Sequence, residues 1–288
     1  MQGEAGSHIE LTAVPETLLW TLFNRATEAG RSDSVLVDPE AVRLLGSIDF
    51  PFEARFGKPH WSQAQALRAL RFDQAVGDFL SVHPGGTVVA LGEGLETQFW
   101  RVDNGRVSWL TVDLPEVVEL RRRFLPSSPR LSAVACSALD VRWMDAVDTS
   151  APVLITAQGL LMYLPLEDVR DLVARCAAVF PDGGMICDAI PRWLSRSTTR
   201  DDVPASDAYA APPMLWGMDA SELVSSQGLH PAGVTAVELA APRGRGLLFG
   251  YLLPLLSRVP GLRETRLPFF PWVIVRLAFP SRGARVLT

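Results

Sequence analysis

Short apolar runs alternate with helical patterns along the middle of the chain. Val88 to Leu91 is one such run, and it contains no polar side chain. Strands that are covered on both faces are apolar throughout, so this run predicts a central parallel strand. Further strands are predicted at 107–112, 131–136, 153–157, 185–189, 234–239 and 272–279. The alternation predicts a doubly wound α/β sheet of seven strands, mostly parallel, in which the last two need not be parallel to the rest.

Apolar residues at helical spacing predict the helices. The first covers Glu16 to Ala29, and a second begins at Asp38-Pro39, where aspartate can cap a helix and proline suits its first turn. The segment 46–59 is rich in aromatic residues, Pro and Gly, which predicts a loop, and helical spacing returns over 62–80. Later helices are predicted at 115–124, 166–180, 219–227 and 246–258.

These elements divide the chain into three regions. Residues 1–80 are not needed to build the sheet, and we expect them to form a helical lid over the carboxyl edge of the strands, where ligands of such folds bind. Residues 81–190 are expected to form a Rossmann-like, cofactor-binding core. Residues 191–288 add a connection whose composition is typical of a mobile segment, then substrate-side helices and the final strands of the same sheet.

Composition argues against two kinds of partner. The chain has 288 residues, a net charge of -5 and a pI near 5.5, whereas a nucleic-acid partner requires a concentrated basic face. The basic run 121–123 is expected to be the solvated face of a helix. The apolar run 247–256 is too short for a membrane span, which needs roughly 20 residues, and it is interpreted as a buried or substrate-facing helix.

The cysteines and the start of the chain bear on metal binding and location. Cys136, Cys176 and Cys187 have neither metal-ligand spacing nor an even count, so we expect no metal site and a reducing environment. The chain does not open with a charged, then apolar, signal segment. A cytoplasmic location is therefore expected.

A glycine turn follows the first predicted strand of the sheet. Gly92 and Gly94 tolerate positive φ and leave the backbone open to a ligand, although an ordinary βα turn is the alternative interpretation. A dinucleotide fingerprint would place a third glycine at the position of Thr97. Its absence favours a nucleoside without a pyrophosphate, of which S-adenosylmethionine is the common case.

An acidic residue ends the second strand. Asp113 lies about twenty residues after the glycine turn, where a carboxylate can accept hydrogen bonds from both ribose hydroxyls. Because a helix is predicted to begin at Pro115, a capping role for Asp113 is the alternative.

Four segments add a family resemblance. They are VVALGEGLETQFWR, TVDLPEVVELRRRFLP, ITAQGLLMYLPLEDV and FPDGGMICDAI. In this order and spacing they resemble the leucine carboxyl methyltransferase family, and within it the bacterial branch of tetracenomycin-type polyketide O-methyltransferases. The similarity runs from about Glu16 to Ala189 and more loosely to the C-terminus. It implies a seven-stranded methyltransferase fold that uses S-adenosylmethionine and often methylates a carboxylate or phenolic oxygen.

The resemblance also implies roles for single residues around the cofactor. Arg68 would hold the methionine carboxylate, a task suited to a guanidinium, with an exposed helix charge as the alternative. The other implied cofactor contacts are Gly92 beneath the methionine portion, Asp113 at the ribose, Ser137 and Ala138 at the adenine, Gln158 at the methionine end, and Arg25 as a further carboxylate contact. Gly94, Leu114 and Leu139 are also expected to contact the cofactor. The alternative interpretation of Ser137 is that it is an ordinary turn residue without a ligand contact.

The chain departs from the family pattern at several positions. Ser137 stands where relatives usually carry an acid, and Gln158 where they usually carry Glu. Glu93 replaces a small residue in the glycine turn, and Glu96 and Gln98 replace the usual Asp and Arg. These changes leave open a fold-retaining member that does not methylate, either a binding protein or a cyclase-like tailoring protein. A nicotinamide-dependent oxidoreductase is a second alternative, disfavoured by the missing third glycine.

The chemistry of methyl transfer limits what the acceptor site needs. A carboxylate, with a pKa of about 4, arrives ionised, whereas a phenol, with a pKa of about 10, would gain from a base. Of the four histidines only His60, beside Trp61, is placed to serve as that base, and the lack of a convincing base favours a carboxylate acceptor. We expect a metal-independent O-methyltransferase that acts on a small, largely apolar metabolite. Aromatic residues that can line its pocket are Trp20, Phe23, Trp61, Trp216, Phe249 and Tyr251.

Overall fold

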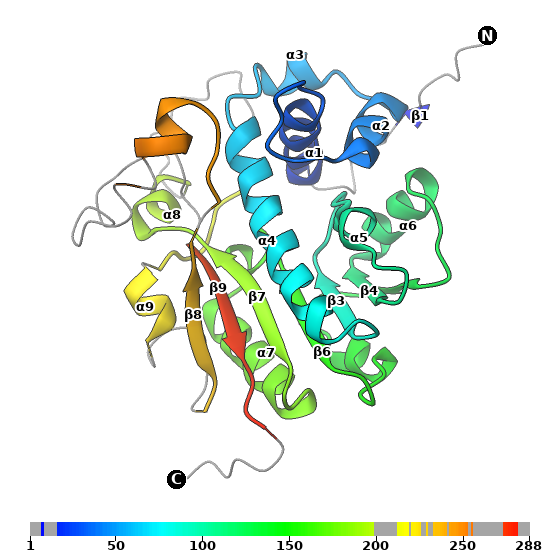
Figure 1. Ribbon diagram of the computed structural model, residues 1–288, viewed down its shortest axis with the longest axis vertical. Helices are drawn as coiled ribbons and strands as arrows, with labels where there is room; N and C mark the ends of the chain where they lie inside the picture. Colours follow the sequence, from blue (N-terminus) through cyan, green and yellow to red (C-terminus); the bar gives the residue numbers. More distant parts are fainter. Residues whose placement is uncertain are drawn as a thin grey trace.

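A seven-stranded sheet forms the centre of the protein (Figure 1). The computed structural model describes residues 7–8, 16–198, 212–218, 220–225, 229, 233–240, 242–252, 255 and 273–281. The strands lie in the order β5-β4-β3-β6-β7-β9-β8. Their bounds are β3 Thr87–Leu91, β4 Ser108–Asp113, β5 Leu131–Ala135, β6 Val153–Ala157, β7 Gly184–Ala189, β8 Thr235–Leu239 and β9 Val273–Ala278.

Strand direction confirms the predicted fold class. Strands β3 to β7 run parallel to one another, whereas β9 is antiparallel to both β7 and β8. The order in which the chain adds strands changes direction at β3, which pairs with β4 on one side and with β6 on the other. In a doubly wound sheet the carboxyl ends of strands at such a switch point border the ligand site.

Alternate residues of the central strands enter two different cores. Val89 and Leu91 pack on one face with Val173 of helix α7 (Leu166–Val179). Val88 and Ala90 pack on the other face in a cluster that includes α4 (Ser62–Val82). Because both faces are covered, every residue of β3, β6 and β7 is buried, which is the physical origin of their continuous apolar runs.

The N-terminal helices agree with the predicted pattern except at one segment. Helix α1 spans Glu16–Ala29, and Asp38 caps α2 (Pro39–Ser47) by accepting a hydrogen bond from Ala41 N at 3.0 Å. The expected loop 46–59 instead contains strand β2 (Ile48–Asp49), paired with β1 (Ser7–His8), and helix α3 (Phe52–Phe56). Phe52 and Phe56 lie one helical turn apart and pack against Phe23, so aromatic packing overrides the local turn signals.

Shorter helical elements connect the strands. The helix predicted at 115–124 has the expected bounds, and α7 ends one residue earlier than expected. The remaining elements are α5 (Gln98–Val102), α6 (Pro115–Phe124), η1 (Val141–Ala146), η2 (Leu161–Tyr163), α8 (Arg192–Thr198), α9 (Ala220–Val224) and the π-helical turn η3 (Leu248–Leu252). None of the helices in the described ranges has the length and hydropathy required for a transmembrane span.

The C-terminal apolar segment differs from the prediction. Where a buried or substrate-facing helix was expected at 246–258, residues 248–252 form η3, in which no side chain is buried. Leu247 and Tyr251 are 69% and 72% exposed. Residues 253–254 and 256–258 of that predicted helix lie outside the described residues, as do residues 199–211 of the predicted mobile connection and Trp272 of the last predicted strand.

Candidate functional site

A cavity of about 490 Å³ opens at the carboxyl ends of β3 and β6. Its floor comes from the end of β3, the glycine turn and the turn after β6, and α1 and α4 contribute its N-terminal wall. The floor residues are Ala90, Leu91, Gly92, Glu93, Gly94, Glu96, Thr156, Gln158 and Gly159. The cavity therefore lies at the switch point of the sheet, at the edge where the glycine turn predicts a ligand.

Both glycines of the turn have the conformation that the sequence predicts. Gly92 and Gly94 have φ of 57° and 56°, values that other residues rarely adopt. A Cβ on Gly92 would lie 2.7 Å from the Leu160 side chain. The turn thus brings bare backbone to the cavity between β3 and the segment after β6.

Asp113 holds this turn in place. Its Oδ2 accepts a hydrogen bond from Gly94 N at 2.7 Å, and its Oδ1 accepts one from Leu114 N at 2.8 Å. Burial raises the pKa of the carboxyl, and the two backbone N–H groups oppose that rise. Helix α6 has Leu114 at its N-cap and no side-chain cap, so Asp113 does not cap it. Asp113 and Leu114 are not among the cavity-lining residues, and their contact with ribose stays a prediction.

Arg68 reaches the cavity from α4 and is anchored by a carboxylate that sequence reasoning missed. It is 5% exposed, so its alternative role as an exposed helix charge is wrong. Its Nη1 lies 3.2 Å from Asp188 Oδ2, and Asp188 Oδ1 accepts a hydrogen bond from Gly159 N at 2.6 Å. The missed signal is an acid within an otherwise apolar strand, β7, because a buried charge requires a partner.

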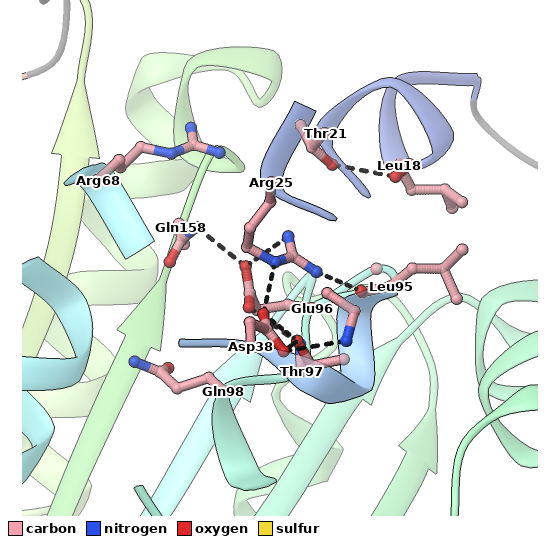
Figure 2. Close-up of polar contacts among 12 residues, drawn as sticks. Leu18, Thr21, Arg25, Asp38, Arg68, Leu95, Glu96, Thr97, Gln98 and Gln158 are labelled. Atoms are coloured by element: carbon pink, nitrogen blue, oxygen red, sulfur yellow. Dashed lines mark hydrogen bonds and ion pairs between the residues drawn. The ribbon is translucent and has the colours of Figure 1, made fainter. Parts of the chain in front are cut away.

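Arg25 belongs to a buried ionic network beneath the cavity (Figure 2). Its Nε lies 3.1 Å from Asp38 Oδ2, its Nη1 lies 2.9 Å from Glu96 Oε2, and its Nη2 donates to Leu95 O. Arg101 pairs with the same two carboxylates and with Asp73. The network joins α1, α2, α4 and α5, so these elements are coupled directly below the glycine turn.

Electrostatics keep the central carboxylate of this network ionised. Burial alone would raise the pKa of Glu96, but the guanidinium groups of Arg25 and Arg101 outweigh burial and lower that pKa to about 2. Glu96 therefore carries its charge at neutral pH.

Glu96 and Gln98 were identified from the sequence only as departures from the family pattern. In the structure Gln98 donates to Asp73 at 3.0 Å, and the two residues that line the cavity are Glu96 and Gln98.

Gln158 presents an unsatisfied acceptor at the cavity. Its Nε2 donates to Glu96 Oε2 at 3.2 Å, as Figure 2 shows. Its Oε1 is buried and has no hydrogen-bond partner among the described residues. A buried orphan acceptor is costly unless a ligand donor completes it, so this atom indicates a site for an N–H or O–H group.

Ser137, Ala138 and Leu139 lie in the turn after β5. Ser137 is exposed and its Oγ accepts a hydrogen bond from Leu139 N at 3.2 Å, as the turn-residue reading predicts. Ala138 O accepts from Trp143 Nε1 at 3.0 Å. The three residues are absent from the cavity lining, and their contact with adenine stays a prediction.

Glu93 and Arg121 correct one prediction. Arg121 was expected on a solvated helix face, but it is 6% exposed, and its Nη2 lies 3.0 Å from Glu93 Oε2. Its Nη1 also donates to Gly94 O at 2.7 Å and to Glu96 O at 2.9 Å. The Glu93 side chain, itself 3% exposed, accepts from Thr111 Oγ1 at 2.6 Å. The unusual glutamate in the glycine turn is thus the partner of a buried arginine.

Only some of the aromatic residues predicted to line the pocket do so. Trp20 and Trp61 line the cavity, together with Phe56. Phe23 and Trp216 are buried in the core instead, while Tyr251 is exposed. Phe249 is not among the lining residues. His60 is exposed at the cavity, in a position that suits its predicted access to an acceptor.

Comparison with known proteins identifies the family. Residues 19–177 match the family model described as leucine carboxyl methyltransferase. The chain is 35% identical over 192 residues to the tetracenomycin polyketide synthesis O-methyltransferase TcmP of Streptomyces glaucescens, an alignment that covers 66% of this chain and 71% of TcmP. The chain belongs to the leucine carboxyl methyltransferase family.

Other relatives of this methyltransferase agree. It is 28% identical over 218 residues to the S-adenosyl-L-methionine-dependent methyltransferase dpfgK of Gibberella zeae, covering 70% of each chain. Its fold matches a candidate methyltransferase from Thermobifida fusca with a TM-score of 0.52 at 14% identity, over 94% of this chain and 100% of the other. At that identity the structural match shows the fold alone.

The methyltransferase cavity fits the family's cofactor, S-adenosylmethionine. A nucleoside with an amino-acid tail requires open backbone beside the strand, an acceptor for an ammonium group and a cation for a carboxylate. The cavity offers the backbone at Gly92, the unsatisfied Oε1 of Gln158 and the guanidinium of Arg68. These three groups come from different parts of the chain and line one cavity.

Proposed function

We propose that this methyltransferase acts on oxygen, either a carboxylate or a phenolic oxygen, of a small and largely apolar metabolite. The observation that carries the proposal is the composition of the cavity wall beyond the cofactor-facing groups. Aromatic and aliphatic side chains line it, including Trp20, Phe56, Trp61, Ile190 and Leu194. Such a wall suits a ring system, and the O-methyltransferase TcmP among the relatives supports oxygen as the acceptor atom.

Within this proposal, three groups hold the cofactor's methionine end and sugar. The Arg68 guanidinium, oriented by Asp188, binds the carboxylate, and the Oε1 of Gln158 accepts from the ammonium group. The Asp113 carboxylate, already bonded to the glycine turn, accepts from the ribose with its remaining lone pairs. Ser137 to Leu139 border the adenine, and Arg25 supports the site from beneath through Glu96.

The protein's share of the chemistry is orientation and exclusion of water. When bound, the cofactor would supply a methyl group activated on a sulfonium: an oxygen nucleophile would bond to the methyl carbon in line as the carbon–sulfur bond breaks, and S-adenosylhomocysteine would leave as a neutral thioether. The apolar wall removes water from the acceptor and holds its ring. A carboxylate acceptor needs no base because it is ionised at neutral pH. For a phenol, His60 at the cavity is the candidate base that accepts the hydroxyl proton.

The first test of this function measures cofactor binding and methyl transfer separately. Calorimetric titration with S-adenosylhomocysteine should give heat, and Gln158→Met should weaken binding about tenfold because it removes the buried acceptor. Gln74→Met, an exposed glutamine of α4, is the matched control and should bind like the wild type. Absence of heat with both cofactor and product at millimolar concentration would refute the cofactor site.

The second test uses cofactor with a radiolabelled methyl group and a panel of aromatic acids, phenols and amines. Label should enter esters or phenol ethers, and transfer to nitrogen alone would contradict the oxygen proposal.

A fold-retaining protein that does not methylate is the alternative. It is favoured by Gln158 and Ser137 and by the engagement of both Asp113 oxygens with backbone N–H groups. That alternative predicts binding of S-adenosylhomocysteine without label transfer to any acceptor.

A further inference from the structure

A cationic side chain stands on a tight turn at the cavity. Lys58 and His60 flank Pro59, and His60 N donates a hydrogen bond to Lys58 O at 2.8 Å. Both side chains line the same cavity as Gly92 and Arg68. The turn is positioned by α3 on one side, through the buried ring of Phe56, and by the start of α4 on the other. Lys58 is also the only lysine in the sequence of 288 residues.

The arginine and glutamate side chains that line the cavity each have an ion-pair partner within the protein. Arg25 pairs with Glu96 and Asp38, Arg68 pairs with Asp188, and Glu93 pairs with Arg121, at distances of 2.9 to 3.2 Å. Within the described ranges, the exposed ammonium of Lys58 has neither an ion pair nor a hydrogen bond. The cavity therefore carries a positive charge on its apolar, aromatic side that the protein itself does not compensate.

We propose that Lys58 binds an anionic group of the methyl acceptor, so that the acceptor is an apolar ring compound that carries a negative charge. This inference rests on the proposed function and names its substrate class. A protein of net charge -5 repels anions at long range, so a cation on the acceptor side of the cavity favours retention of an anionic acceptor. Trp61, close to Lys58 in the same wall, supplies the apolar surface for the ring.

The test compares two probes that share a ring and differ in charge: naphthalene-2-carboxylate and naphthalene-2-carboxamide. Binding is measured by calorimetry at pH 7.5 in the presence of saturating S-adenosylhomocysteine. The wild type should bind the acid about tenfold more tightly than the amide, a ratio typical of one charge-assisted hydrogen bond. Lys58→Gln should abolish this preference, and Lys58→Arg should retain it.

Two controls keep the result specific. Arg106→Gln removes one exposed positive charge away from the cavity and should leave the preference for the acid unchanged. Retention of the preference in Lys58→Gln overturns the proposal, as does equal binding of the two probes, or binding of neither, by the wild type. Because S-adenosylhomocysteine binding is measured first and should be equal in all variants, failure of the cofactor site is distinguished from failure of the Lys58 site.

The single lysine permits an independent readout. Acetylation with an N-hydroxysuccinimide ester labels only Lys58 and the terminal amine, and mass spectrometry separates the two peptides. Naphthalene-2-carboxylate should slow acetylation of Lys58 at least threefold relative to the terminal amine, and the carboxamide should not. Equal acetylation rates with and without the acid would contradict contact between Lys58 and the anion.

Discussion

Gly159 shows how one residue without a side chain places a charged one. Its φ is 69°, and a Cβ at this position would lie 3.0 Å from Arg68 Nη1. Its N–H is held by Asp188, the same carboxylate that pairs with Arg68. The backbone conformation of Gly159 therefore depends on the position of the Arg68 guanidinium and on its pair with Asp188. A change in any one of these three features requires a change in the others.

Gly159→Ala should disturb both stability and the cofactor site. We expect a loss of about 1 to 3 kcal/mol in the free energy of unfolding, because alanine is strained at this φ. We also expect weaker S-adenosylhomocysteine binding, because the added methyl group displaces Arg68. Urea unfolding and calorimetry measure the two effects.

Gly77→Ala is the control for that substitution. Gly77 lies inside α4, and a Cβ there would meet no heavy atom within 4 Å. This change should raise stability by roughly 0.5 to 1 kcal/mol through helix propensity and leave binding unchanged. Equal stability of Gly159→Ala and the wild type would show that the turn after β6 tolerates a side chain.

At the scale of elements, ion pairs join four helices to the end of β3. Asp38 caps α2 and at the same time faces Arg25 of α1 and Arg101 of α5. Glu96, directly after the glycine turn, faces the same two arginines. Buried ion pairs of this kind contribute little net stability while intact, but removing one partner is costly because it leaves a charge uncompensated.

Glu96→Gln should therefore destabilise the protein in a pH-dependent way. The folded pKa of Glu96, about 2, lies below its ordinary value of 4.5, so its charge stabilises the fold at pH above about 4.5. The stabilisation is lost as the pH falls toward 2. At pH 7 we expect the variant to be less stable by about 3 kcal/mol, the size that this pKa shift implies. The difference should shrink steadily below pH 4.5.

Chemical unfolding at pH 7, 5 and 3 measures that difference. Glu167→Gln removes a carboxylate from an exposed pair with Arg170 on α7 and should cause little change at any of these pH values. A stability difference between Glu96→Gln and the wild type that is independent of pH would exclude the ionic explanation.

At the scale of the whole molecule, the sheet has a hydrophobic core on each face. Phe72 and Val76 of α4 lie in the same cluster as Val88 of β3 and Trp109 of β4. The lid role of the N-terminal region stays a prediction, and in the structure its helix α4 is one of the helices that cover the sheet, as Figure 1 shows. Packing of this kind predicts that residues 62–82 and the sheet unfold together.

Phe72→Ala tests this coupling. Phe72 is fully buried, so its truncation should cost about 3 to 5 kcal/mol and lower the stability of the entire fold in one transition. Val82→Ala, at a residue 70% exposed at the end of the same helix, should have little effect. Hydrogen exchange of α4 and of β6 should accelerate together in Phe72→Ala. Acceleration confined to the N-terminal helices would instead indicate an independently unfolding lid.

Local patterns determined the elements and the family. Continuous apolar runs located the strands of the sheet, and capping residues such as Asp38 located helix ends, because these signals depend on neighbouring residues and on burial of both faces. The glycine turn and Asp113 were found for the same reason. Their spacing is a property of one βα unit and is visible along the chain.

Tertiary structure alone decided how the charges are arranged. Arg68 and Asp188 are separated by 120 residues, and Arg101 and Asp38 by 63, so no local pattern connects them. Arg121 looked like one of three solvated arginines until folding placed it against Glu93. A side chain's ionic partner depends on which elements the sheet order brings together, and that order is a long-range property. The sequence therefore determined the scaffold and its ligand class, whereas folding determined which groups of the cavity are neutralised and which face a ligand.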